Sequence, residues 1–246
     1  MTVAAVASAA GVGLACGPAL RVAIVANLRP RDDPAHGRCP LCSAPSLVWR
    51  RPLAVIPTAL WGRCPACLAR IAAPAAVAEL AGASTLGVLA VRVHPALVLG
   101  AAGTLAAAGI VLAVVDARTH RLPDRVMVPT LAVVAVLLGT AGIAGHRTAQ
   151  LAAAVVGGAA TFAFYVLLGL VTGGVGFGDE KLGAGCGLLL GWYGWDVVLW
   201  GTTLTFVLAA LFLLGHLARG RALRRSRIAL GPFMLLGCLV TLMLVA

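Results

Sequence analysis

Three charged residues, Asp179, Glu180 and Lys181, stand side by side in the apolar, glycine-rich stretch TGGVGFGDEKLGAGCGLLLG, residues 172–191. A further acidic residue, Asp116, ends the apolar run GIVLAVVD. An ionised carboxylate costs roughly 2.5–3.5 kcal/mol at the centre of a membrane-spanning helix. Acidic residues next to two apolar runs therefore point to a shared chemical purpose.

A pair of neighbouring carboxylates can hold one shared proton near neutral pH, because two close negative charges repel each other. The ionised member can take a proton from water, and the protonated member can polarise a peptide carbonyl. Asp116 and Asp179 would thus support aspartic proteolysis. In the alternative interpretation each Asp pairs with a nearby Arg, such as Arg118, or caps a helix. Gly176 and Gly178 fit both, since they permit close helix approach and unusual backbone angles.

Four of the seven cysteines form two CxxC pairs, CPLC at 39–42 and CPAC at 64–67, with 21 residues between them. Each pair can offer two thiolates to one tetrahedral Zn²⁺. We expect a structural zinc site there; redox chemistry and unligated thiols are the alternatives. The expected ligands are Cys39, Cys42, Cys64 and Cys67.

The composition indicates an integral membrane protein. Of 246 residues, 61% are hydrophobic and 11% are charged, whereas soluble domains are about half apolar and a quarter charged. We expect an all-α protein with about eight membrane-spanning helices, because each span needs about 20 apolar residues. The expected helices lie at about 2–27, 75–91, 95–115, 126–145, 150–171, 178–194, 197–217 and 228–246.

The basic residues set the expected topology and explain the net charge of +11 without a nucleic-acid partner. Sixteen of the nineteen lie in the loops after the first, third, fifth and seventh expected helices, which places those loops in the cytoplasm. We expect a first helix at 1–27, a cytoplasmic four-cysteine insert at 28–73 and a membrane-embedded domain at 74–246. Glu180 is expected to face the cytoplasm without a role.

Several motifs together resemble the type IV prepilin peptidases, or leader peptidases, of the GxGD aspartic protease group. The paired CxxC motifs with Ile56–Pro57 between them are similar to the family's first loop. DARTHRLPD (116–124) resembles its first catalytic segment, and GFGDEKLGAGCGLLLG (176–191) resembles its GxGDxKLxAxxGxxLG segment. The resemblance covers nearly the whole chain.

The resemblance implies an endopeptidase of the bacterial inner membrane that removes the short basic leader of prepilins or pseudopilins at the cytoplasmic face. Asp116 and Asp179 match the catalytic aspartates, and Asp124 matches a supporting Asp. Lys181 matches the motif's Lys, which would tune Asp179 or meet lipid phosphate.

Many members of this family also methylate the new amino terminus with S-adenosylmethionine. In this chain Glu79 is the candidate counterpart of a methyl-transfer glutamate, or else a buried acid at a helix end. The segment between Pro74 and Glu79 is longer than the family's Pro-x-x-Glu, and GPALRVAIVAN (17–27) keeps Gly17 but has no Asn at the family's usual place. Methyl transfer is therefore left open.

Two other functions remain as alternatives. One is a small ion or proton transporter that uses intramembrane carboxylates. The other is a zinc-ribbon assembly factor with inert spans. The substrate, the pilus or secretion system served and the oligomeric state do not follow from the sequence.

Overall fold

The computed structural model describes residues 3–28, 38–39, 41–44, 61–64, 66–70, 76–172, 176–219 and 229–246. The chain divides into two compact units, Met1–Val91 and Arg92–Ala246, and each is described separately below. Ile56–Pro57 and Pro74 lie outside the described residues, as does most of the predicted insert. The predicted division at residues 27 and 73 stays a prediction.

In the first unit, helices α1 (Val3–Asn27) and α3 (Val77–Arg92) are joined by an ion pair between Arg21 and Glu79. The guanidinium of Arg21 is fully buried and donates two hydrogen bonds to the Glu79 carboxylate, one of them 3.2 Å long. A buried charge is tolerated only when it is paired in this way. The same helices approach closely, since a Cβ on Gly17 would lie 2.5 Å from Cγ of Glu79.

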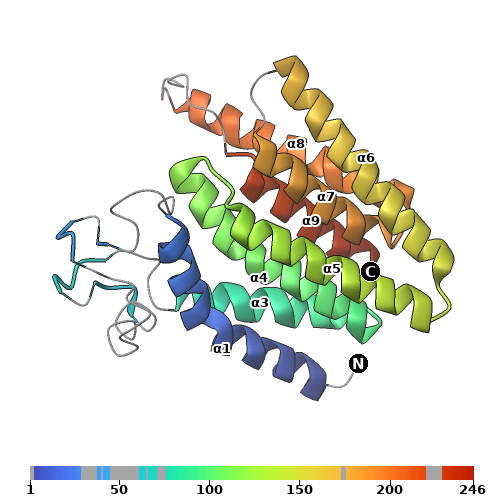
Figure 1. Ribbon diagram of the computed structural model, residues 1–246, viewed down its shortest axis with the longest axis horizontal. Helices are drawn as coiled ribbons and strands as arrows, with labels where there is room; N and C mark the ends of the chain where they lie inside the picture. The colour runs from blue at the N-terminus through green and yellow to red at the C-terminus, as the bar shows by residue number, and fades with distance from the viewer. Residues whose placement is uncertain are drawn as a thin grey trace. The chain divides into compact units, whose positions relative to one another are not determined.

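The described residues of the second unit form six helices that run back and forth (Figure 1). They are α4 (Ala96–Thr119), α5 (Asp124–Ala144), α6 (Thr148–Thr172), α7 (Phe177–Gly191), α8 (Trp195–Ala218) and α9 (Gly231–Val245). The connections at 120–123, 145–147 and 192–194 are too short for anything but antiparallel neighbours. Helix α7 contacts all five other described helices of the unit, so its position is fixed by packing on several sides.

The glycines of α7 explain how so apolar a helix packs so closely. A Cβ on Gly187 would lie 2.1 Å from the Thr161 hydroxyl and 2.5 Å from the Gly157 carbonyl oxygen on α6. Small residues allow two helix backbones to meet without a hydrophobic driving force between them. The glycine-rich motif therefore packs α7 against α6 and fixes the position of its first turn.

Within the described residues, five helices are long and apolar enough to cross a membrane: α1, from Val6 on, and α4, α5, α6 and α8. Helix α9 is a shorter apolar helix. Large apolar side chains such as Val136, Leu167 and Leu211 are exposed on these helices, as expected where lipid is the solvent. The predicted all-α, multi-pass membrane architecture is confirmed, and the helix boundaries lie within a few residues of those expected.

Candidate active site

Asp116 lies on the last turn of α4 and is 5% exposed. Its Oδ2 accepts a hydrogen bond from the backbone N–H of Gly231, the first residue of α9, at 3.1 Å. The free N–H groups at a helix amino terminus carry partial positive charge and bind anions. A Cβ at position 231 would lie 2.8 Å from Oδ2. Only glycine lets this amide reach the carboxylate so closely.

Asp179 occupies the first turn of α7, where its side chain caps its own helix. Its Oδ2 accepts a hydrogen bond from the backbone N–H of Gly176 at 3.2 Å, and its own N–H donates to the Gly176 carbonyl at 2.9 Å. A carboxylate three residues after the cap is a familiar way to satisfy a free amide. Capping and chemistry are therefore compatible uses of Asp179.

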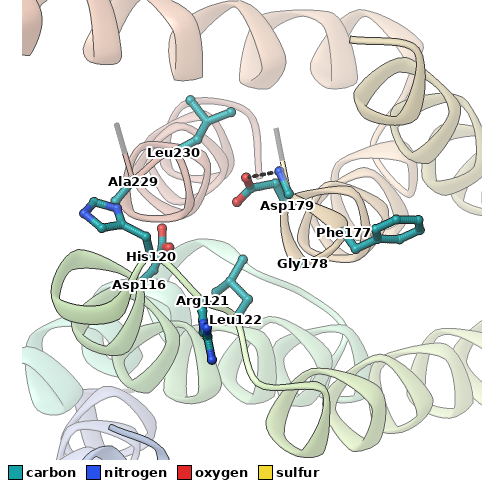
Figure 2. Close-up of a pocket in the computed structure, with 10 residues that line it drawn as sticks. Asp116, His120, Arg121, Leu122, Phe177, Gly178, Asp179, Ala229 and Leu230 are labelled. Atoms are coloured by element: carbon teal, nitrogen blue, oxygen red, sulfur yellow. Dashed lines mark hydrogen bonds between the residues drawn. The ribbon is translucent and has the colours of Figure 1, made fainter. Parts of the chain in front are cut away.

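The two carboxylates face one pocket of about 300 Å³, shown in Figure 2. They lie close enough to repel each other electrostatically. The wall is built from the end of α4 with the loop after it, the start of α7 and the residues before α9. The lining residues are Asp116, His120, Arg121, Leu122, Gly176, Phe177, Gly178, Asp179, Ala229 and Leu230.

The two predicted glycines of the motif differ in what they do. A Cβ on Gly178 would lie 2.4 Å from Cβ of Leu122, so glycine is required where the loop after α4 crosses the start of α7. Gly176 has φ −92° and ψ 156°, which any residue adopts, and a Cβ there would lie 4.0 Å from Oδ2 of Asp179, an ordinary contact. Gly176 contributes its backbone N–H, which donates a hydrogen bond to the Asp179 carboxylate.

Asp124 and Lys181 meet each other instead of the carboxylate pair. They form an ion pair between the start of α5 and α7. Both are partly exposed, with 63% of the Asp124 side chain and 30% of the Lys181 side chain accessible. The pair therefore joins two of the elements that carry the pocket, on their solvent side.

Glu180 does not face solvent, and the expectation that it faces the cytoplasm is wrong. The residue is 6% exposed. Position 180 lies three residues before Gly183, which packs on Tyr165 of α6, so this side of α7 is covered by its neighbour. The side chain adds a negative charge that repels the carboxylate of Asp179.

The four predicted cysteines come together as one cluster. Their Sγ atoms all lie within 4.8 Å of one another. Cys39 and Cys67 are 3.8 Å apart at sulfur, and Cys42 and Cys64 are 3.7 Å apart. A tetrahedron with metal–sulfur bonds of about 2.3 Å has edges of about 3.8 Å. The cluster therefore has the donors and the dimensions of a tetrahedral zinc site.

Each CxxC turn has the same backbone hydrogen bonds. The N–H of Cys39 donates to the Ala44 carbonyl at 2.8 Å, and the N–H of Cys64 donates to the Ala69 carbonyl at 2.9 Å. Burial raises the pKa of the Cys39 thiol, but hydrogen bonds from the backbone of Cys42 and Leu41 outweigh burial and lower it to about 7. The first turn thus favours the thiolate form of Cys39, which is the form that binds a metal ion.

Comparison with known proteins places these features in one family. A sequence profile of the type IV leader peptidase family matches residues 103–219. A Stutzerimonas stutzeri protein named prepilin leader peptidase/N-methyltransferase is 30% identical over 210 residues, which are 85% of this chain and 71% of that protein. The chain belongs to the type IV leader peptidase family.

Further relatives with the same name support this assignment. A Burkholderia pseudomallei protein is 33% identical over 83% of this chain and 65% of its own length. A Dichelobacter nodosus protein is 30% identical over 80% of this chain and 67% of its own length. No solved structure gives a significant match. The segment matched by the leader peptidase profile contains both carboxylates of the pocket, and the cysteine cluster lies before it.

Sequence reasoning missed several residues that contact the predicted site residues. His120 lies four positions after Asp116, one helical turn away, and that spacing was a usable signal. Gly231 is 115 positions from Asp116, and no local pattern connects them. Arg21 stands near the position where the family's Asn was expected, but only the packing of α1 against α3 shows that it binds Glu79.

Proposed function

We propose that this protein is a membrane-embedded aspartic endopeptidase that removes the short basic leader from type IV prepilins or pseudopilins. The observation that carries the proposal is the pair of carboxylates, Asp116 and Asp179, that reach one pocket from two helices. The names of the relatives supply the substrate class. Nothing in the comparisons favours a transporter.

The pair can perform the hydrolysis with groups already in the pocket. The ionised carboxylate takes a proton from a water molecule, whose oxygen attacks the scissile carbonyl carbon. The protonated carboxyl donates its proton to the carbonyl oxygen. When the intermediate collapses, the C–N bond breaks and the nitrogen takes the proton that the first carboxyl gained from water. A hydroxyl of the intermediate returns its proton to the second carboxylate, which restores the singly protonated pair. One water is consumed, and a carboxylic acid and an amine leave.

The remaining motif residues support the catalytic pair. The Gly176 amide orients the Asp179 carboxylate, and Gly178 lets the loop with Leu122 close over the start of α7. Asp124 and Lys181 hold α5 to α7. These residues help to position the Asp179 carboxylate and have no direct contact with the peptide in this mechanism.

A zinc ion held by the four-cysteine cluster would stabilise the fold of its own segment. The ligands would be Cys39, Cys42, Cys64 and Cys67, and a closed set of four thiolates supplies a structural crosslink. An insert of this size cannot bury enough apolar surface alone.

The relatives' names include N-methyltransferase, and S-adenosylmethionine would be the methyl donor for that activity. In this chain the candidate residue, Glu79, is bound by the buried Arg21. The described residues around Glu79 thus fit a structural ion pair, and no methyl-transfer step is assigned to them.

The proposed location is the bacterial inner membrane, with lipid around the helices and no nucleic-acid partner. We expect the pocket and the cysteine cluster on the cytoplasmic side, because basic residues gather in the loops on that side of the expected topology. This is the side on which a basic leader would remain.

The function is tested by incubating the purified protein in detergent with a prepilin that has a basic leader and a Gly before its apolar helix. Mass spectrometry is expected to find one cut, after that Gly. The same preparation, reconstituted in liposomes, is assayed for proton flux. Flux that depends on Asp179, without any cleavage, would overturn the peptidase proposal in favour of the transporter.

A further inference from the structure

His120 is an ionisable residue of the pocket to which the proteolytic mechanism gives no role. It ends α4 in the left-handed conformation, with φ 51° and ψ 40°, and its backbone N–H donates to the Asp116 carbonyl at 2.8 Å. The residue is exposed and lines the pocket. Figure 2 shows its imidazole on the same wall as the Asp116 carboxylate, within range of a favourable charge interaction.

Among the described residues, the charged side chains near Asp116 differ from those near Asp179. From α4 and the loop after it come Asp116, His120 and Arg121, and the Arg121 guanidinium points away from both carboxylates in Figure 2. From α7 come Asp179 and the buried Glu180, whose charge repels that of Asp179.

Helices α9 and α5 also pack beside the pocket, and none of their described charged side chains lines it. The described residues at the start of α9 offer only the Gly231 amide, which also binds Asp116. At the start of α5, Asp124 is paired with Lys181. Each carboxylate thus accepts one backbone N–H hydrogen bond, but the charged side chains that act on the two differ. The His120 imidazole attracts the Asp116 carboxylate, whereas the carboxylates of Asp116 and Glu180 repel that of Asp179.

We propose that His120 is a positioning residue that keeps Asp116 ionised and leaves the shared proton of the pair on Asp179. Asp116 is then the base that receives the proton of water, and Asp179 is the acid that protonates the peptide carbonyl oxygen. This inference rests on the proposed peptidase function. Imidazole is suited to the role because it changes charge between about pH 5 and 8.

The test is the pH dependence of kcat/KM for prepilin cleavage by His120→Asn. Asparagine tolerates the left-handed backbone, so the end of α4 is kept and the imidazole charge is removed. The acidic limb of the profile reports ionisation of the carboxylate pair in the free enzyme. Without the cation, ionising Asp116 becomes harder, so the limb is expected to move to higher pH by about 0.5–1 unit. At high pH, kcat/KM of His120→Asn is expected to converge with that of the wild type.

The matched control is His146→Asn. His146 also follows a helix end with a positive φ, of 53°, and is exposed, but it lies after α5 and outside the pocket. Its profile is expected to coincide with that of the wild type. An unshifted limb in His120→Asn, or an equal shift in both variants, overturns the inference. A wild-type protein that does not cleave prepilin overturns the peptidase function itself, so the two failures are distinguishable.

Discussion

The aspartate pocket and the four-cysteine cluster are both sets of polar side chains gathered at a point, but they are assembled in different ways. The cysteine cluster consists of two short turns, each of which orients its own thiols by hydrogen bonds within six residues. The pocket takes one carboxylate from α4, one from α7 and a backbone amide from α9. The cluster is therefore local chemistry repeated twice, whereas the pocket exists only when three helices pack.

The largest expected effect follows from removing either carboxylate of the pocket. Asp116→Asn and Asp179→Asn are each expected to reduce prepilin cleavage by about 10²–10⁴-fold or more, since neither amide can exchange a proton with water or peptide. Zinc content is expected to stay at the wild-type value. Initial rates measure the cleavage, and elemental analysis measures the zinc content. Asp196→Asn, on the exposed first turn of α8, is the control. Full cleavage by either pocket variant would refute the assignment.

The complementary change removes a ligand from the cysteine cluster. Cys64→Ser is expected to lower bound zinc from about one ion per chain to near zero, because a closed tetrahedral site does not hold zinc tightly with three thiolates. Limited proteolysis is expected to cut residues 28–73 faster. Cys16→Ser, outside the cluster on α1, should keep its zinc. A reduced, intact wild type without zinc would contradict the site.

A smaller effect is expected from disturbing the pocket without removing a carboxylate. Gly231→Ala places a methyl group 2.8 Å from the Asp116 Oδ2, so the amide hydrogen bond lengthens and the carboxylate moves. Misplacing a catalytic group by about 1 Å can cost about 100-fold, and we expect a 10- to 100-fold fall in kcat with little change in KM. Gly139→Ala, in open space on α5, is the control. Equal rates for the two variants would show that the α9 contact is dispensable.

The smallest effect is expected at the exposed ion pair beside the pocket. Asp124→Asn is expected to change thermal stability by less than about 1 kcal/mol, because solvent screens the charges of exposed pairs. Cleavage should change only a few-fold. A thermal melt and a cleavage assay in low and high salt measure the two quantities. A loss as large as that of Asp179→Asn would mean that Asp124 takes part in the chemistry.

Much of the candidate site was predictable because its signals are local. The CxxC spacing pointed to the cluster, since two thiols three positions apart fit one turn. Asp116 and Asp179 stood out because carboxylates are costly next to apolar helices. The prediction failed for Glu180, since adjacency to Asp179 does not reveal which side of α7 is covered by α6.

The sequence by itself determined the membrane class, the approximate helix limits, the family and the residues able to do chemistry. These follow from hydropathy and spacing, which act over one helix or one turn. Only the tertiary structure decided which partner each group meets. The Gly231 amide binds Asp116, and His120 lines the same pocket as Asp116. Lys181 forms an ion pair with Asp124, and Arg21 forms one with Glu79. The reason is physical: each contact joins separate helices or depends on how a helix ends, and packing decides which side chains face each other.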